Sequence, residues 1–220
     1  MYKKKLTLFL VASALMIVQV IFAGTILAGE RDVSGLTVAE RNKLDIFFSN
    51  FSEVRLPDFT EGNLPLDALL NFGVEHVRMN TPGREMTSLD AHHWGVDIER
   101  VRASVDKYFG IKLAETDLRA TTRYSLSNSG FYILPKADGE GAVFSQVVSF
   151  EAVDAGRYKA VLNVYRASPT FTGDVHADPS VWLLGDRQDM PHLIAVYNAE
   201  VMTTGLQEPS YYLVAYQKQK

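Results

Sequence analysis

The 220-residue sequence contains no cysteine. Disulfide bridges, thiol nucleophiles, zinc–thiolate sites and a lipid-modified cysteine are therefore excluded. Hydrophobic residues make up 47% of the chain and charged residues 22%, values that are ordinary for a globular protein and argue against disorder. A chain of this length buries enough apolar surface to fold without covalent cross-links.

Positive charge is also scarce. The formal net charge is −4, and the first 29 residues contain Lys3, Lys4 and Lys5 but no acidic residue. The remaining residues carry 19 basic side chains against 26 acidic ones, a net charge of −7. This balance lacks the basic footprint of proteins that bind phosphate backbones, so no nucleic-acid partner is expected. It gives no general attraction to anionic lipid either, so we expect membrane contact only through the N-terminal segment.

Local catalytic signatures are missing as well. The sequence has no G-x-S-x-G, no phosphate-binding loop, no dinucleotide-binding glycine pattern and no H-E-x-x-H. Its histidines also lack the i, i+4 spacing that places two metal ligands on one helix face. We therefore expect no cofactor and no metal, although catalytic residues can be scattered along a chain. The histidines are His76, His92, His93, His176 and His192.

The N-terminal segment, residues 1–29, has the pattern of an export signal. Three lysines precede an uncharged stretch that runs from Leu6 to Gly29, the order that leaves the N-terminus in the cytoplasm and sends the rest across a membrane. The stretch is long enough for a cleaved signal peptide or a retained anchor. Small residues after Ala23 and Ala28 permit cleavage, but isoleucine occupies the third position before each site. Both alternatives predict an exported, extracellular or cell-envelope domain spanning residues 30–220.

Apolar periodicity predicts helices first and strands afterwards. Thr37 and Glu40 form a capping box, and helical stripes follow over residues 44–51, 65–80 and 97–110. Alternating patterns after residue 120 predict a strand at 130–134 and two hairpins. The hairpins cover residues 142–166 and 193–217, with a long surface loop at 168–191 between them. This order indicates an α+β fold, with N-terminal helices packed on one twisted antiparallel sheet. Cystatin-like and NTF2-like folds have this kind of layout and are the analogues considered.

Four sequence blocks resemble an uncharacterised family of exported or membrane-anchored proteins of clostridia and related anaerobic bacteria. They are LDIFFSNFSE at residues 44–53, KYFG at 107–110, GFYILPKADGEG at 130–141 and FSQV at 144–147. The blocks run in the same order as in that group and span most of the chain after residue 40. The resemblance implies an envelope location and no assigned reaction.

Aromatic side chains concentrate in the predicted strands, where alternation would direct some of them outward. Exposed tyrosines on an antiparallel sheet can bind a glycan or a peptide. We therefore expect an uncharacterised, non-enzymatic extracytoplasmic module that binds an envelope protein, a peptide or a glycan. The candidate binding residues are Phe51, Phe131, Tyr132, Asp138, Glu140, Phe144 and Gln146.

The alternative is a metal-dependent or acid/base hydrolase that uses His92 or His93 with Asp138 or Glu140. Two carboxylates in one short loop could hold a cation or act as an acid/base pair. Alternating glycines and acids are also typical of a tight, solvated turn. The enzyme hypothesis requires a histidine and a carboxylate within hydrogen-bonding reach in a concave site.

Overall fold

The computed structural model describes residue 33 and residues 35–82, 86–119, 123–136, 142–182, 189–203 and 210–220. Within these ranges it contains five helices and two antiparallel sheets, which confirms the predicted α+β class. The helices are α1 (Val38–Glu53), α2 (Leu66–Asn80), α3 (Ile98–Phe109), α4 (Glu115–Leu118) and α5 (Pro179–Trp182). Every described helix is too short or too polar to span a membrane. The predicted export segment, residues 1–29, lies outside the described residues.

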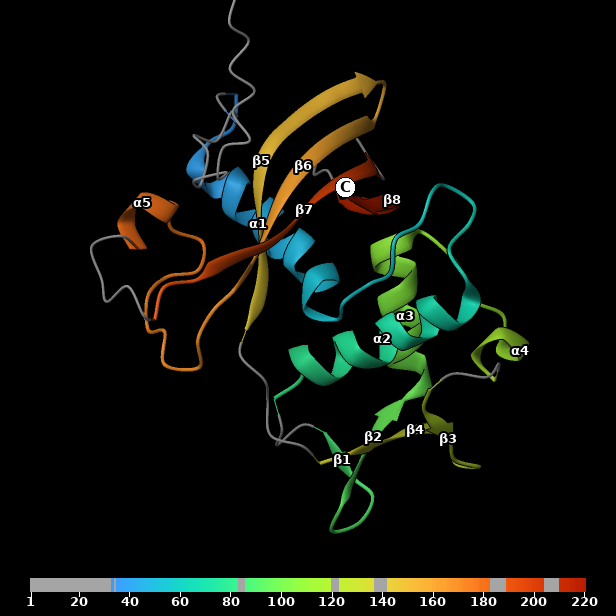
Figure 1. Ribbon diagram of the computed structural model, residues 1–220. Helices are drawn as coiled ribbons and strands as arrows, with labels where there is room; N and C mark the ends of the chain where they lie inside the picture. The colour runs from blue at the N-terminus through green and yellow to red at the C-terminus, as the bar shows by residue number, and fades with distance from the viewer. Residues whose placement is uncertain are drawn as a thin grey trace, which may run out of the picture.

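Two four-stranded sheets replace the single sheet that the sequence predicted. The small sheet has the order β1-β2-β4-β3, and the main sheet has the order β5-β6-β7-β8. Figure 1 shows α2 and α3 between the two sheets, with α1 crossing the main one. The small sheet contains β1 (Thr87–Ser88), β2 (His93–Asp97), β3 (Ser125–Leu126) and β4 (Phe131–Pro135). The main sheet contains β5 (Val143–Asp154), β6 (Arg157–Arg166), β7 (His192–Thr203) and β8 (Tyr211–Lys218).

The predicted order of helices before strands was wrong at two places, one of which is the short α5 between β6 and β7. The hairpin of β1 and β2 is inserted between α2 and α3, before the point where the alternating pattern begins. Its first strand is two residues long, too short for periodicity to reveal. The register pairs β2 with β4, so this early hairpin joins the strand that was predicted at residues 130–134.

The helix ends follow the predicted caps. The Thr37 hydroxyl accepts a hydrogen bond from the Glu40 amide, and the Glu40 carboxylate accepts one from the Thr37 amide, completing the capping box. The Asp97 carboxylate accepts from the Glu99 amide at the start of α3. Gly110 ends α3 in the left-handed conformation, with a φ of 64°. These local signals therefore fix where the predicted helices start and stop.

Polar side chains of α1 cover the edge of the main sheet at β5. The Asp45 carboxylate accepts a hydrogen bond from the Val147 amide at 2.7 Å, and the Ser49 hydroxyl accepts one from the Ser145 amide at 2.9 Å. These acceptors take the place of a neighbouring strand, since β5 is an edge strand. The blocks at residues 44–53 and 144–147 thus meet, which gives both a structural role.

The opposite edge of the sheet is covered by main chain. Phe59 exchanges two backbone hydrogen bonds with Tyr216 of β8, at 2.8 and 3.0 Å. Both edge strands are therefore partly paired, which limits the addition of an extra strand there.

A continuous hydrophobic cluster joins the helices to both sheets. Phe51 of α1 lies at its centre and is fully buried. Its ring contacts Phe72 of α2, Phe109 of α3 and Tyr216 of β8, with centroid distances of 5.4, 5.7 and 6.3 Å. Gly73 permits α2 and α3 to approach closely, because a Cβ there would lie 2.7 Å from Val101. The core thus depends on aromatic rings packed between three helices and a sheet.

Candidate functional site

The aromatic residues that the sequence suggested for binding lie in the interior. Phe51 and Tyr132 are buried, and Phe131 is half-buried. The Tyr132 hydroxyl donates a 2.5 Å hydrogen bond to the Leu118 carbonyl, which ties β4 to α4. These contacts give Phe51 and Tyr132 a packing role. Among the described residues, no large hydrophobic side chain that is exposed is aromatic.

Phe144 and Gln146 are also buried, beneath the segment that follows β6. Phe144 stacks on Tyr165 at 5.6 Å, and the Trp182 ring packs edge-on against both. The Gln146 amide nitrogen donates 2.8 Å hydrogen bonds to the carbonyls of Val175 and Ala177. The predicted surface loop at 168–191 thus carries a small apolar cluster that covers one end of the main sheet.

The residues of the hydrolase hypothesis are only partly described. Asp138 and Glu140 lie outside the described residues, so their place relative to the histidines stays a prediction. His92 is exposed on the turn between β1 and β2, and the His93 ring nitrogen Nδ1 lies 2.8 Å from the Asp90 carboxylate. The same carboxylate accepts from the His92 and His93 amides, which is a turn-forming arrangement. No group of three potential metal ligands occurs within the described ranges.

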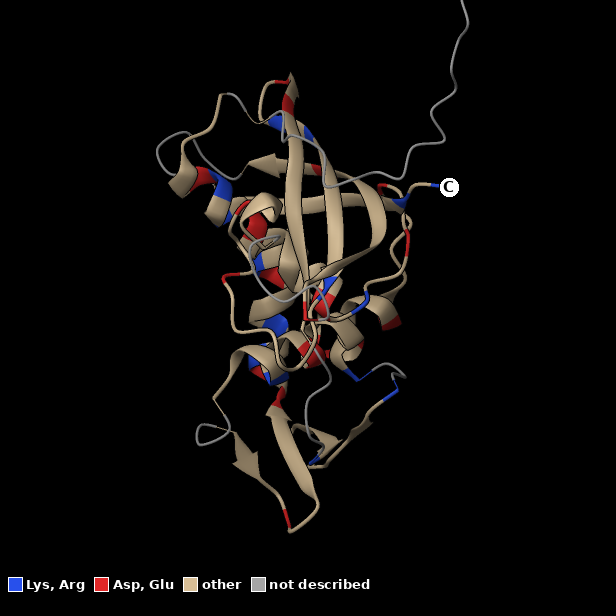
Figure 2. Cartoon of the chain, turned by 60° about the vertical axis from the view of Figure 1, so that its left-hand side comes forward, with Lys and Arg blue, Asp and Glu red and all other residues tan. Residues whose placement is uncertain are grey.

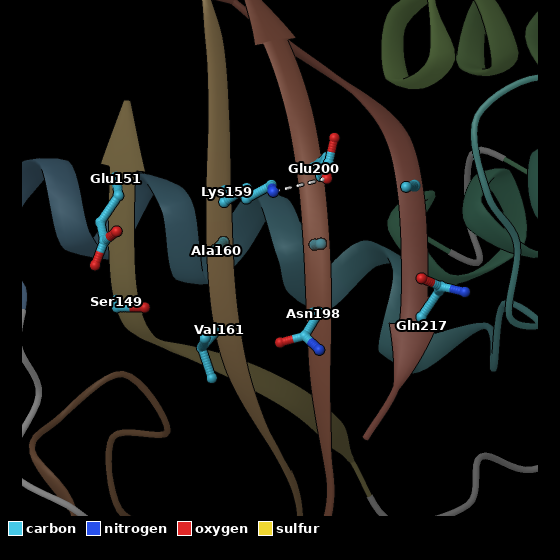
Figure 3. A pocket seen from close by; sticks show the side chains of 10 residues that line it. Ser149, Glu151, Lys159, Ala160, Val161, Asn198, Glu200 and Gln217 are labelled. Carbon is cyan, nitrogen blue, oxygen red and sulfur yellow. Dashed lines mark ion pairs between the residues drawn. The ribbon is translucent and has the colours of Figure 1, made fainter. Parts of the chain in front are cut away.

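The outer face of the main sheet is the face that points away from α1. The part of this face that the segment after β6 leaves open forms a mainly polar hollow, which we call the outer trough. It has a volume of about 390 Å³, within the range of about 300–1,000 Å³ that is typical of small-ligand sites. Figure 3 shows its polar side chains projecting from the strands on the side facing away from α1, whereas Ala160 and Ala199 belong to the hydrophobic cluster beneath. Its lining is formed by Ser149, Glu151, Lys159, Ala160, Val161, Asn198, Ala199, Glu200, Ala215 and Gln217.

Strand register explains how these side chains come together. Glu151, Lys159 and Glu200 are directly paired across β5, β6 and β7, so they form one row across the sheet. Two residues away, a second row runs through Val161, Asn198 and Gln217 on β6, β7 and β8, again in direct register. Side chains two apart on a strand share a face. The trough is therefore formed by two adjacent rows of mainly polar side chains, with Val161 as the apolar member of the second row.

Charges in the trough are nearly balanced. The Lys159 ammonium lies 3.6 Å from the Glu200 carboxylate, which also accepts a 3.0 Å hydrogen bond from the Arg157 guanidinium. A second nitrogen of Arg157 pairs with Glu61 at 2.5 Å. Figure 2 shows the same balance more widely, with basic and acidic residues interspersed and most of the long strands uncharged. The outer trough consequently offers hydrogen-bonding groups without a strong field of one sign.

Two polar clusters outside the trough have structural explanations. The buried Glu75 carboxylate accepts hydrogen bonds from Arg78, Arg123 and Tyr124, which joins α2 to the chain before β3. The Ser104 hydroxyl lies 3.0 Å from Nδ1 of His76. Burial and the neighbouring Lys107 lower the pKa of His76 to about 4, so the ring stays neutral at pH 7. Ser104 is itself buried between α2 and α3, out of reach of a substrate.

Sequence reasoning missed the outer trough because it looked for exposed aromatics. Period-2 alternation was visible, since Ser149, Glu151, Lys159, Asn198 and Glu200 all occupy alternate strand positions. Alternation alone does not say which face the helices cover. Most aromatic residues of the main sheet pack against the helices, Phe144 and Tyr165 lie beneath the segment after β6, and the polar residues line the part that stays open.

Comparisons of the chain with protein-family models, with curated proteins and with solved structures found no match. The site is therefore interpreted from the geometry and chemistry of its own residues.

Proposed function

We propose that the protein is an exported, non-enzymatic binding module whose outer trough holds a neutral glycan. One observation carries the proposal: the part of the outer face that the segment after β6 leaves open is hollowed and lined by two registered rows of mainly polar side chains. A site on a sheet is held rigidly, which limits the conformational entropy lost on binding.

The chemistry of the lining favours sugar hydroxyl and acetamido groups. Glu151 and Glu200 offer carboxylate acceptors, Lys159 offers donors, and Asn198 and Gln217 offer both. A neutral ligand fits the near balance of charge, because Lys159 lies between two carboxylates and Glu200 is also paired with Arg157. Since both sheet edges are partly covered, an extended peptide that adds a strand is less well accommodated.

The export part of the proposal is supported by the lysine-led apolar pattern of residues 1–29. The resemblance to exported and membrane-anchored proteins supports the same location.

Binding can be tested by isothermal titration calorimetry of the full chain in mild detergent. The probes are chitotetraose, cellotetraose and penta-alanine. We expect one of the two glycans to bind and the peptide to give no heat. Asn198→Ala should weaken glycan binding about tenfold, because it removes hydrogen bonds inside the trough.

Asn63→Ala is the matched control, since Asn63 is an exposed asparagine in the turn after Phe59. It should leave glycan affinity unchanged. Binding of penta-alanine alone would replace the glycan proposal with a peptide-binding one. Equal losses for both alanine variants would remove the outer trough as the site.

A further inference from the structure

A second hollow lies on the other face of the main sheet, beside the end of α1. It has a volume of about 170 Å³ and is bounded by the end of α1, the turn after it and strands β5 to β8. Apolar side chains form much of its lining, together with three cationic ones: Arg55, Arg166 and Lys218. Within the described part of the chain, no acidic residue lines it. We call it the inner hollow.

Arg55 is held at a backbone conformation that arginine disfavours. Its φ is 54°, and it is the sole non-glycine residue with a positive φ within the described ranges. The Leu56 amide donates to the Phe51 carbonyl at 3.0 Å, and the Arg55 amide donates to the Ser52 carbonyl at 3.1 Å. This pair of bonds is the Schellman arrangement, in which glycine is usual at the position of Arg55. The chain therefore carries a local strain at the place where a guanidinium reaches the inner hollow.

Tyr216 also lines the inner hollow and has a buried hydroxyl that no described residue satisfies. Its side chain is 1% exposed, and its hydroxyl has no hydrogen-bond partner among the described residues. Buried polar groups are nearly always paired. Burial and the nearby Tyr197 and Asp58 raise the pKa of Tyr216 well above its usual value, so the hydroxyl keeps its proton. An O–H donor is therefore present without an acceptor in the described part of the chain.

These observations have one common explanation. Strained and unsatisfied groups gather at functional sites, where they contact a ligand. Three cationic side chains, with no acidic residue in the described lining, select a negative charge. Apolar neighbours such as Val164 and Ala195 select a hydrocarbon portion beside that charge.

We propose that the inner hollow binds a small amphipathic anion, a phosphate or carboxylate that carries a short apolar group. The site lies across the sheet from the outer trough and is independent of the glycan proposal. The same chemistry occurs in a free anion and in the headgroup region of an anionic lipid.

Calorimetry of the full chain tests this with phenyl phosphate, inorganic phosphate and benzyl alcohol. Phenyl phosphate should bind more tightly than either of the others, because it alone supplies both the charge and the apolar group. Arg166→Gln and Lys218→Gln should each weaken its binding about tenfold. Lys112→Gln, which removes an exposed lysine outside the hollow, is the matched control and should leave the affinity unchanged.

Tyr216→Phe separates binding from folding. Removal of an unpartnered buried hydroxyl should not lower the melting temperature, whereas phenyl phosphate affinity should fall severalfold. Vesicles of phosphatidylglycerol, compared with phosphatidylcholine, distinguish the two sources. Binding to the anionic vesicles that Lys218→Gln abolishes assigns a lipid headgroup, and phenyl phosphate binding without vesicle binding assigns a free anion. The proposal is wrong if phenyl phosphate gives no heat, or if Arg166→Gln and Lys218→Gln bind it as the parent does.

Discussion

Replacing Arg55 with glycine should stabilise the fold and weaken anion binding at the same time. Arg55 follows α1 with a φ of 54°, a conformation that costs an L-residue about 1–2 kcal/mol. Glycine removes that strain but loses about 0.4–1 kcal/mol through the greater freedom of its unfolded chain. The net gain is about 0.8 kcal/mol. For a chain of this size, such a gain raises the melting temperature by about 2–3 °C.

Thermal unfolding followed by circular dichroism measures the first effect, and phenyl phosphate calorimetry measures the second. Arg55→Lys is the matched control, because it keeps both the positive charge and the backbone strain. It should melt with the parent and retain most of the affinity, whereas Arg55→Gly should melt higher and bind about tenfold more weakly. A lower melting temperature for Arg55→Gly would show that the arginine side chain contributes more to folding than its strain costs. Unchanged affinity would remove Arg55 from the anion site.

Other predictions concern pH and the core. Burial raises the pKa of Glu53 from 4.5 to about 7. The free energy of unfolding should therefore fall as pH rises from about 4.5 to 7, because the carboxyl ionises more readily in the unfolded chain. In urea titrations, Glu53→Gln should be about 2 kcal/mol more stable than the parent at pH 8 and equal to it at pH 4. The pKa of His76 is lowered from 6.5 to about 4. The stability that the neutral ring contributes is therefore lost as pH falls from about 6.5 to 4, and His76→Gln should flatten the plot of unfolding free energy against pH in that range. A parallel profile for either variant would contradict the corresponding assignment. Asp45→Ala leaves the Val147 amide without its acceptor and should cost about 2–3 kcal/mol in urea unfolding, against no change for the exposed Asp106→Ala. Phe51→Ala should cost about 3–5 kcal/mol, and a cost below 1 kcal/mol would contradict its central place in the core.

Much of the fold could be predicted from local signals. The capping box at Thr37 and Glu40 and the cap of α3 at Asp97 are short-range interactions that the sequence displays directly. The hairpin predicted at residues 142–166 turns at Asp154, Ala155 and Gly156, three residue types that favour turns, and Gly156 has a φ of 81°. The division into two sheets depends on which strands pair over long separations, such as β2 with β4, and no local pattern encodes that. Likeness to cystatin-like or NTF2-like folds stays a prediction.

The candidate sites were harder to predict than the fold. Tyr132 and Phe144 were expected to belong to a binding surface, but Tyr132 packs into the main hydrophobic cluster and the segment after β6 buries Phe144. Arg55 gave no signal, because a left-handed residue that is not glycine has no sequence signature. Both hollows arise from residues on separate strands, which tertiary structure alone brings together.

Chemical-shift mapping would locate a bound glycan on the surface of the protein. Amide spectra of the isotope-labelled full chain would be recorded during titration with the glycan that gives heat in calorimetry. The largest shifts should occur on the outer trough, at residues 149–151, 159–161, 198–200 and 215–217, and the amides around the inner hollow should not shift. Shifts centred on another surface, or no shifts at millimolar glycan, would contradict the claim that the open face of the main sheet is the binding site.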